Sequence, residues 1–230
     1  MCIMLKMILI HSLILVSCFC LYSQTNSVTD IDGNTYKTVR IGDQIWMAEN
    51  LRTSKFNDGS QIAQVTDNTS WSQTRSSAWC WFGNDSNHDK VYGKLYNWYA
   101  VANDNLCPTG WHLPTEAHGS EGSDWATLIR TLGGSDQAGG KLKQQGFNFW
   151  LAPNIGANNQ AGFLGLPGGS RQANGVFDGI RFEGMWWNSL NSSLLEFTWS
   201  RSRILLFDSD RVDYFDGDKR MGLSVRCIKG

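Results

Sequence analysis

Four of the tryptophans in this sequence, at positions 150, 186, 187 and 199, lie among arginine and asparagine side chains. Eleven tryptophans occur in 230 residues, and the excess over a simple core lies between positions 150 and 199. Sugars present apolar C–H faces and polar edges, so a site that binds them combines an aromatic platform with hydrogen-bonding groups. This pattern predicts a ligand-binding site, and its candidate residues are Trp150, Trp187, Trp199, Arg181, Asn188 and Arg201. Burial in the core is the alternative for each tryptophan.

Two of these tryptophans stand next to each other, at Trp186 and Trp187. Neighbouring residues on a strand point to opposite faces of the sheet. We therefore expect at most one of the pair to enter the core from that sheet. The other is expected to be exposed or covered by a loop.

A loop rich in side-chain oxygens is the second candidate site. Calcium accepts Asp and Asn oxygens on loops, so this loop is a possible calcium site, with Asn84, Asp85, Asn87 and Asp89 as ligands. The alternative is a set of solvated turn carboxylates beside Gly83. Histidines and cysteines are too scattered to predict a zinc site. No other cofactor is expected.

Catalytic motifs are missing from the sequence. It contains no Gly-x-Ser-x-Gly elbow, P-loop or dinucleotide fingerprint. Glycoside hydrolysis needs two carboxylates across a cleft, one of them in an apolar setting. Glu49, Glu183 and Glu196 lie near aromatic residues, but any chain with 21 acidic residues offers similar pairs. We therefore name no catalytic residue and expect that the protein is not an enzyme.

The overall composition fits one folded domain. A length of 230 residues with 41% apolar side chains is enough for a sizeable core. The net charge of −1 lacks the basic excess of a nucleic-acid-binding protein, so no nucleic-acid partner is expected.

The N-terminus has the pattern of a secretory signal. Lys6 precedes an apolar run over residues 7–21, which is short for a membrane span but suits a signal peptide. We predict a signal peptide over residues 1–23, a flexible leader over 24–29 and a single domain over 30–230. One alternative is a lipobox ending at Cys18, whose lipid would be the protein's only contact with a membrane; another is a retained anchor. Each version places the domain outside the cytoplasm, secreted or at the outer cell surface.

Removal of the signal peptide leaves three cysteines, Cys80, Cys107 and Cys227. An oxidising compartment favours a disulfide, and three thiols allow three pairings with one thiol left over. Cys80 stands between Trp79 and Trp81 and is interpreted as a buried apolar thiol, with a nucleophile as the alternative. The favoured disulfide is Cys107 with Cys227, which would close a loop of about 120 residues.

The pattern of apolar residues predicts an α+β fold with two short helices on short antiparallel sheets, joined by long loops rich in glycine and tryptophan. One helix begins after Ser123 and ends at Gly133, with apolar residues at helical spacing. A second is expected from about Gly93 to Ala102. Residues 52–78 are expected to form a surface loop with a short strand around 62–65. Strands are predicted for a hairpin over 36–47 and for 162–166, 182–187, 197–200, 203–207 and 223–228.

Several ordered phrases resemble the Fibrobacter succinogenes major paralogous domain, a family of exported bacterial proteins. They are residues 38–51 (TVRIGDQIWMAENL), 92–98 (YGKLYNW), 107–115 (CPTGWHLPT), 132–134 (LGG), 138–143 (AGGKLK), 166–171 (LPGGSR) and 222–227 (GLSVRC). Residues 118–122 depart from the pattern as an insertion before the Ser123 helix. The resemblance implies an extracytoplasmic, often surface-associated domain in bacteria that handle polysaccharides.

The late glycine- and tryptophan-rich phrases are also similar to C-type-lectin-like and formylglycine-generating-enzyme-like domains. This resemblance implies a C-type-lectin-like architecture. The enzyme would need two nearby cysteines near the end of the chain, whereas only Cys227 lies in the C-terminal half.

These observations together predict an exported, noncatalytic binding domain, whose leading ligand class is polysaccharide or another cell-envelope component. The alternatives are a polysaccharide-active enzyme and a structural cell-envelope protein without a soluble ligand.

Overall fold

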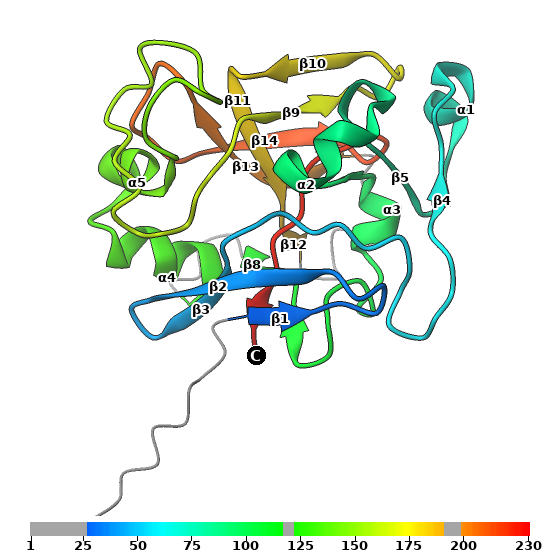
Figure 1. Cartoon of the computed structure of the whole chain (residues 1–230), viewed down its shortest axis with the longest axis horizontal. Helices are drawn as coiled ribbons and strands as arrows, with labels where there is room; N and C mark the ends of the chain where they lie inside the picture. The colour runs from blue at the N-terminus through cyan, green and yellow to red at the C-terminus, as the bar shows by residue number, and fades with distance from the viewer. Residues whose placement is uncertain (1–26, 117–121, 191–198) are drawn as a thin grey trace, which may run out of the picture.

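A computed structural model describes residues 27–116, 122–190 and 199–230 (Figure 1). The predicted signal peptide, lipobox and first leader residues lie outside this part, as do Glu196 and the start of the strand predicted over 197–200. Within the described ranges, no helix is both long and apolar enough to cross a membrane.

The strands and helices up to residue 101 are β1 (Ser27–Thr29), β2 (Thr35–Ile41), β3 (Gln44–Met47), β4 (Ala63–Gln64), α1 (Asn68–Gln73), β5 (Ala78–Cys80), η1 (Phe82–Asn84), η2 (Ser86–His88), α2 (Asp89–Tyr92), β6 (Leu95–Tyr96) and α3 (Trp98–Val101). The later ones are β7 (Trp111–His112), β8 (Thr115–Glu116), α4 (Asp124–Thr131), α5 (Ser135–Leu142), β9 (Gly168–Arg171), β10 (Phe177–Ile180), β11 (Glu183–Trp187), β12 (Ser189–Leu190), β13 (Trp199–Leu206), β14 (Asp213–Asp218) and β15 (Ile228–Lys229).

The fold is α+β, with short, mainly antiparallel sheets and few short helices, as the sequence predicts. The largest sheet has the strand order β1-β2-β3-β15-β7. Its β2–β3 hairpin confirms the predicted one and turns at Gly42, where φ is +60°. Residues 27–29 correct the predicted flexible leader, because they form β1 and pair in register with β2.

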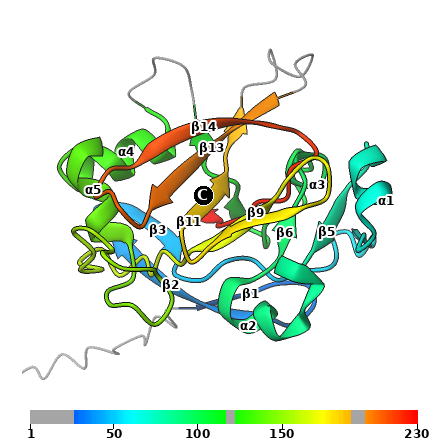
Figure 2. The same ribbon diagram turned by 90° about the horizontal axis from the view of Figure 1, so that it is seen from above.

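The segment that ends in β15 runs through the middle of the molecule. Figure 1 shows it, in red, passing from the level of β13 and β14 down to β3. It pairs with β3 through Ile228 and Trp46, and with β7 through Ile228 and His112. Seen from above, the β13–β14 pair and the β1–β2 hairpin lie on opposite sides of the molecule (Figure 2).

A three-stranded sheet with the order β11-β13-β14 lies between two hydrophobic clusters. Met185 and Trp187 pack in the cluster with Tyr96 and Leu223, whereas Trp186 packs in the cluster with Trp46 and others. Both tryptophans are therefore buried. The expectation that they point to opposite faces of β11 is confirmed. Neither is exposed, and Trp186 is covered in part by the loop before β9, where its ring centre lies 5.8 Å from that of Phe163.

Helix α4 confirms the prediction for residues after Ser123. The Ser123 hydroxyl accepts a hydrogen bond from the Ala126 N–H at 3.3 Å, and Trp125 and Leu128 are buried. The helix predicted from Gly93 is wrong over its first half. Leu95 and Tyr96 pair with β5 instead, and α3 begins only after the Asn97 cap.

Helix α5 was not expected, since it contains Gly139 and Gly140 and glycine is a poor helix former. A Cβ on Gly139 would lie 2.1 Å from the Arg211 carbonyl oxygen, so only glycine permits this packing. Tertiary contact therefore overrides local preference here. Helix α1 likewise interrupts the predicted 52–78 loop, and no strand forms over residues 162–166.

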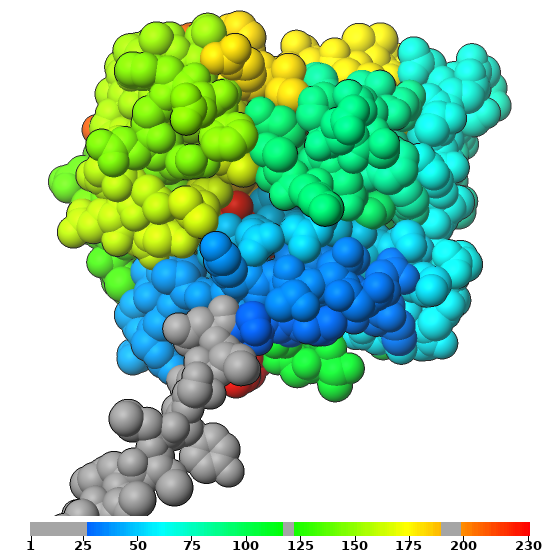
Figure 3. All heavy atoms as spheres, in the orientation of Figure 1, coloured from blue at the N-terminus to red at the C-terminus, as the bar shows by residue number. Residues whose placement is uncertain are grey.

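One side chain, Asn50, connects several segments of the interior. Its Oδ1 accepts hydrogen bonds from Trp186 Nε1 and Arg226 Nε, both at 2.9 Å. Its Nδ2 donates to the Tyr92 carbonyl oxygen and to Ser224 Oγ. The Arg226 guanidinium is fully buried and also donates to the carbonyl oxygens of residues 163 and 164. In the space-filling view, the yellow-green segment before β9 lies above the blue N-terminal strands, and a small red part of the C-terminal segment is visible between them (Figure 3).

The favoured disulfide is confirmed. Cys107 and Cys227 are bonded, with their Cα atoms 5.9 Å apart, and Cys80 is a free, buried thiol. Burial raises the pKa of the Cys80 thiol to about 12, which suits the interpretation as a packing residue.

Removing this cross-link should destabilise the domain strongly. For a closed loop of 120 residues, chain entropy gives a loss of roughly 4–5 kcal/mol in the free energy of unfolding. Guanidinium unfolding of the Cys107→Ser/Cys227→Ser double variant measures this loss. Cys80→Ala, which removes a thiol but no cross-link, is the control and should lose much less. An unchanged stability of the double variant would contradict the structural role of the bond.

Candidate ligand-binding site

Two of the six predicted ligand residues lie in the core. Trp150 and Trp187 are fully buried, and their indole N–H groups donate to the carbonyl oxygens of Gly165 and Tyr96 at 2.9 and 2.8 Å. Neither can serve as an exposed platform, so their assignment to the ligand site is a correction. Trp187 is buried because the hydrophobic cluster that contains Tyr96 and Leu223 covers the face of β11 to which this side chain points.

Asn188 and Arg181 lie at opposite ends of β11. Asn188 is fully buried and its Nδ2 lies 3.4 Å from Glu116 Oε2. Arg181 is exposed in the β10–β11 turn and donates to the Phe147 carbonyl oxygen at 3.3 Å. The five residues of β11 lie between them and alone span roughly 16 Å. The structure therefore does not bring them into one site.

Trp199 and Arg201 do lie together, on one face of β13. Residues two apart on a strand share a face, and the register places Asp216 of β14 opposite Arg201 and Tyr214 opposite Arg203. We call Trp199, Arg201, Tyr214 and Asp216 the sheet-face site. Two of its members come from the predicted set, and two are new.

The charged pair of the sheet-face site is held in a fixed geometry. Arg201 Nε and Nη2 donate to the two carboxylate oxygens of Asp216 at 2.8 and 3.1 Å. The hydrogen bond to Asp216 raises the pKa of Arg201, so the arginine stays charged. The guanidinium carbon lies 4.5 Å from the centre of the Tyr214 ring, and Tyr214 is 62% exposed. An exposed aromatic ring thus stands beside a preorganised donor and acceptor.

A second ion pair lies next to the sheet-face site, on the same face of β13. Arg203 is two residues from Arg201 on β13 and binds both carboxylate oxygens of Glu116, at 2.7 and 2.8 Å. Their side chains are only 12% and 9% exposed. The pair ties β8 to β13 beside the sheet-face site.

The predicted calcium loop forms η1, η2 and the start of α2. Asp89 Oδ1 accepts hydrogen bonds from Trp81 Nε1 and Lys94 Nζ at 2.7 and 2.8 Å. Asp85 caps the backbone N–H of Asn87 at 2.9 Å, and Asn84 donates to the Thr66 carbonyl oxygen. Among the described residues, no group of three His, Cys, Asp or Glu side chains is placed to hold a metal. The calcium site stays a prediction.

The two described glutamates of the enzyme alternative have opposite electrostatic settings. Burial raises the pKa of Glu183, which accepts a hydrogen bond from Ser170 Oγ at 3.2 Å. Burial would also raise the pKa of Glu49, but the Lys37 N–H and the Arg52 guanidinium outweigh it and lower that pKa.

These settings predict opposite effects on acid stability. Between the ordinary pKa of a glutamate and the raised pKa of Glu183, this side chain binds more protons in the folded state than in the unfolded state, so stability falls as pH rises through that window. The Glu183→Gln variant should therefore be more stable than the wild-type protein at neutral pH and should lose this advantage in acid. Glu49 stabilises the fold above its ordinary pKa and loses this as pH falls, so Glu49→Gln should be less stable at neutral pH. Urea unfolding between about pH 3 and pH 8 measures both. Two variants with the same sign of change would contradict these settings.

Comparison with known proteins gives a family for this fold. The Fibrobacter succinogenes major domain matches residues 39–229, which include the end of β2, all of β3, Asn50, both disulfide cysteines and the sheet-face site. No curated protein and no solved structure matches the chain. Because the match covers most of the 230 residues, the chain belongs to the Fibrobacter succinogenes major domain family.

Proposed function

We propose that this protein is an exported, noncatalytic binding domain of C-type-lectin-like architecture, secreted or displayed at the outer cell surface, and that its ligand is a polysaccharide. The observation that carries the proposal is the sheet-face site. An exposed tyrosine ring there adjoins an arginine and a carboxylate whose positions are already fixed.

This combination suits a sugar. The ring of Tyr214 offers an apolar surface for C–H groups, and its side chain loses little rotational freedom on binding. Asp216 can accept hydrogen bonds from hydroxyl groups, and Arg201 can donate to their oxygens. The two charges cancel, which favours a neutral ligand over an anion or a cation.

Export is supported by two independent features. The apolar run over residues 7–21 has the length of a secretory signal. A disulfide such as Cys107–Cys227 persists in oxidising compartments. Cleavage near Ser23 and lipidation at Cys18 both remain compatible with this proposal.

Replacing Tyr214 by Ala should weaken binding to insoluble polysaccharide at least about tenfold, since the aromatic platform is lost. Phe215→Ala is the matched control. Phe215 is the next residue on β14 and is 40% exposed, but its side chain points to the opposite face. A pull-down over a panel of polysaccharides, with thermal melting to check folding, compares the two variants.

The same panel separates the alternatives. Release of soluble sugar by the wild-type protein would show an enzyme and overturn the noncatalytic proposal. No retention on any polysaccharide, with or without calcium, would leave a structural envelope role. Equal losses in both variants would remove the sheet-face site as the binding surface.

A further inference from the structure

Exposed apolar side chains gather where the loop after α5 meets the turn between β10 and β11. The loop is the yellow-green segment beside α5 in Figure 1. Phe147, Ile155 and Phe182 are 58%, 43% and 48% exposed, and we call these three residues the loop platform. Exposed apolar surface that is contiguous is often a binding surface.

Hydrogen bonds bring the three residues of the loop platform together. The Arg181 guanidinium donates to the Phe147 carbonyl oxygen, so Phe147 lies beside the turn that carries Phe182. Phe207 joins the other two, because its carbonyl oxygen accepts from the Ile155 N–H and its N–H donates to the Phe182 carbonyl oxygen, both at 2.9 Å. The rings of Phe182 and Phe207 also meet edge to face, with their centres 5.4 Å apart. The loop platform is therefore one continuous surface.

The loop that carries Phe147 and Ile155 is held in a fixed shape. Asn154 Nδ2 donates to the carbonyl oxygens of Gln144 and Gly146, at 3.0 and 2.9 Å. The Leu151 N–H donates to the Arg181 carbonyl oxygen at 2.9 Å. A surface that is ordered before it meets a ligand loses little conformational freedom on binding.

The surroundings of the loop platform are polar but uncharged. Residues 144–170 contain no charged side chain, although 18% of all residues in the chain are charged. Gln145 and Asn148, which are close to Phe147 in the loop, are exposed. A carboxamide can both donate and accept hydrogen bonds, as sugar hydroxyls require. Aromatic rings beside uncharged amides suit a neutral ligand that has apolar faces and hydroxyl groups.

A bilayer and a second copy of the chain fit this surface less well. Anionic membranes attract clusters of Lys and Arg, whereas Arg181 beside Phe182 is balanced by the exposed Asp208 beside Phe207. The three platform side chains together expose roughly 300 Å². A stable protein–protein interface covers about 800 Å² on each partner. Both comparisons favour a glycan over the other two occupants.

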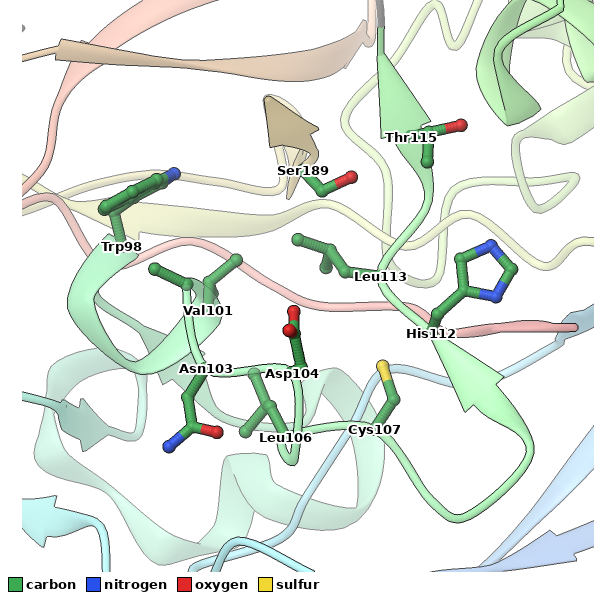
Figure 4. A pocket seen from close by; sticks show the side chains of 11 residues that line it. Trp98, Val101, Asn103, Asp104, Leu106, Cys107, His112, Leu113, Thr115 and Ser189 are labelled. Atoms are coloured by element: carbon green, nitrogen blue, oxygen red, sulfur yellow. The ribbon is translucent and has the colours of Figure 1, made fainter. Parts of the chain in front are cut away.

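The pocket beside α3 lacks this combination. Its volume is about 470 Å³, and α3 with the loop after it forms one side, while β7, β8 and β12 form the other (Figure 4). Trp98 in its wall is only 8% exposed, so its ring offers no face to a sugar. We assign no ligand to this pocket.

We propose that the loop platform is a second contact surface for the polysaccharide. The rings of Phe147 and Phe182 pack against the C–H faces of sugar units, and Gln145 and Asn148 form hydrogen bonds with their hydroxyl groups. This proposal rests on the proposed function for its ligand class.

The second surface changes how a polymer is bound. Phe207, which supports the loop platform, follows Arg201 of the sheet-face site by six positions on and just after β13, a separation of roughly 20 Å along an extended strand. A polymer presents many copies of its repeating unit. Two surfaces on one domain therefore bind it more tightly than either surface alone.

The double variant Phe147→Ala/Phe182→Ala should bind the retained insoluble polysaccharide at least about tenfold more weakly than the wild-type protein. Val176→Ala is the matched control, because Val176 is 51% exposed but lies at the turn between β9 and β10. Thermal melting checks the folding of each variant. Phe147→Ala alone leaves the contact between Phe182 and Phe207 in place, and it should still weaken retention severalfold.

Methyl resonances locate the contact directly. Ile155 and Ile31 are 43% and 44% exposed, but Ile31 lies at the turn between β1 and β2. The variants Ile155→Val and Ile31→Val identify the two δ1-methyl signals by their disappearance. A soluble oligosaccharide cut from the retained polymer should move the Ile155 signal and leave the Ile31 signal in place.

Unchanged retention in the double variant would overturn the loop platform as a binding surface. If Tyr214→Ala still weakens retention in that case, the proposed function stands without it. If the wild-type protein is retained on no polysaccharide, both fall. A homodimer in sedimentation velocity that the double variant abolishes would instead assign the surface to a second copy. Binding to phosphatidylglycerol vesicles that the double variant loses would assign it to a membrane, and either result would overturn the proposal.

Discussion

The hydrogen bonds of the Asn50 side chain join segments of the interior that are far apart in the sequence, and the packing of the rest of the structure depends on them. Its carboxamide satisfies Trp186 and Arg226 with one oxygen and holds residues 92 and 224 with its nitrogen. A residue that could not accept both bonds would leave a buried indole and a buried guanidinium unsatisfied together, and breaking a buried charged network is strongly destabilising. Asn50 is thereby hydrogen-bonded to the segment at 224–226, and Trp186 connects β11 to the same side chain.

A sheet with a core on each face changes what its aromatic residues can do. Met185, Trp186 and Trp187 all turn into protein, so alternation along β11 yields no exposed side chain. Exposed aromatic side chains occur on β14, which forms the other edge of the sheet, and Tyr214 of this strand is exposed to solvent. The same arrangement explains why the sheet-face site lies on β13 and β14 and why Trp186 and Trp187 are packed in the interior. Of the three tryptophans first assigned to a ligand, only Trp199 shares a face with a solvent-exposed aromatic ring.

Local signals in the sequence were sufficient for some elements and not for others. The Ser123 cap, the helical spacing after it and the Gly42–Asp43 turn each act within a few residues, and these elements form as predicted. Helix α5 packs through Gly139 against the carbonyl group of Arg211, which is 72 residues away (211 − 139) and which only a glycine can approach so closely. The burial of Trp187 depends on a second hydrophobic cluster, which the alternation of residues along a strand does not reveal. Tyr214 and Asp216 were missed because their role follows from the register of β14 against β13. An alternation of Tyr214, Asp216 and Asp218 was visible, but nothing local identified its partner strand.

The central path of residues 222–229 also has a consequence for how the chain acquires its structure. This segment supplies Leu223 and Val225 to one cluster, Ile228 to the other, a strand to the first sheet and half of the disulfide. Synthesis proceeds from the N-terminus, so the hairpin at 35–47 waits for a partner nearly two hundred residues away. Contacts of such high sequence separation slow folding and discourage stable partial structures. We expect the nascent chain to remain open until this segment appears, which is the state in which a polypeptide can be threaded through a narrow translocation channel.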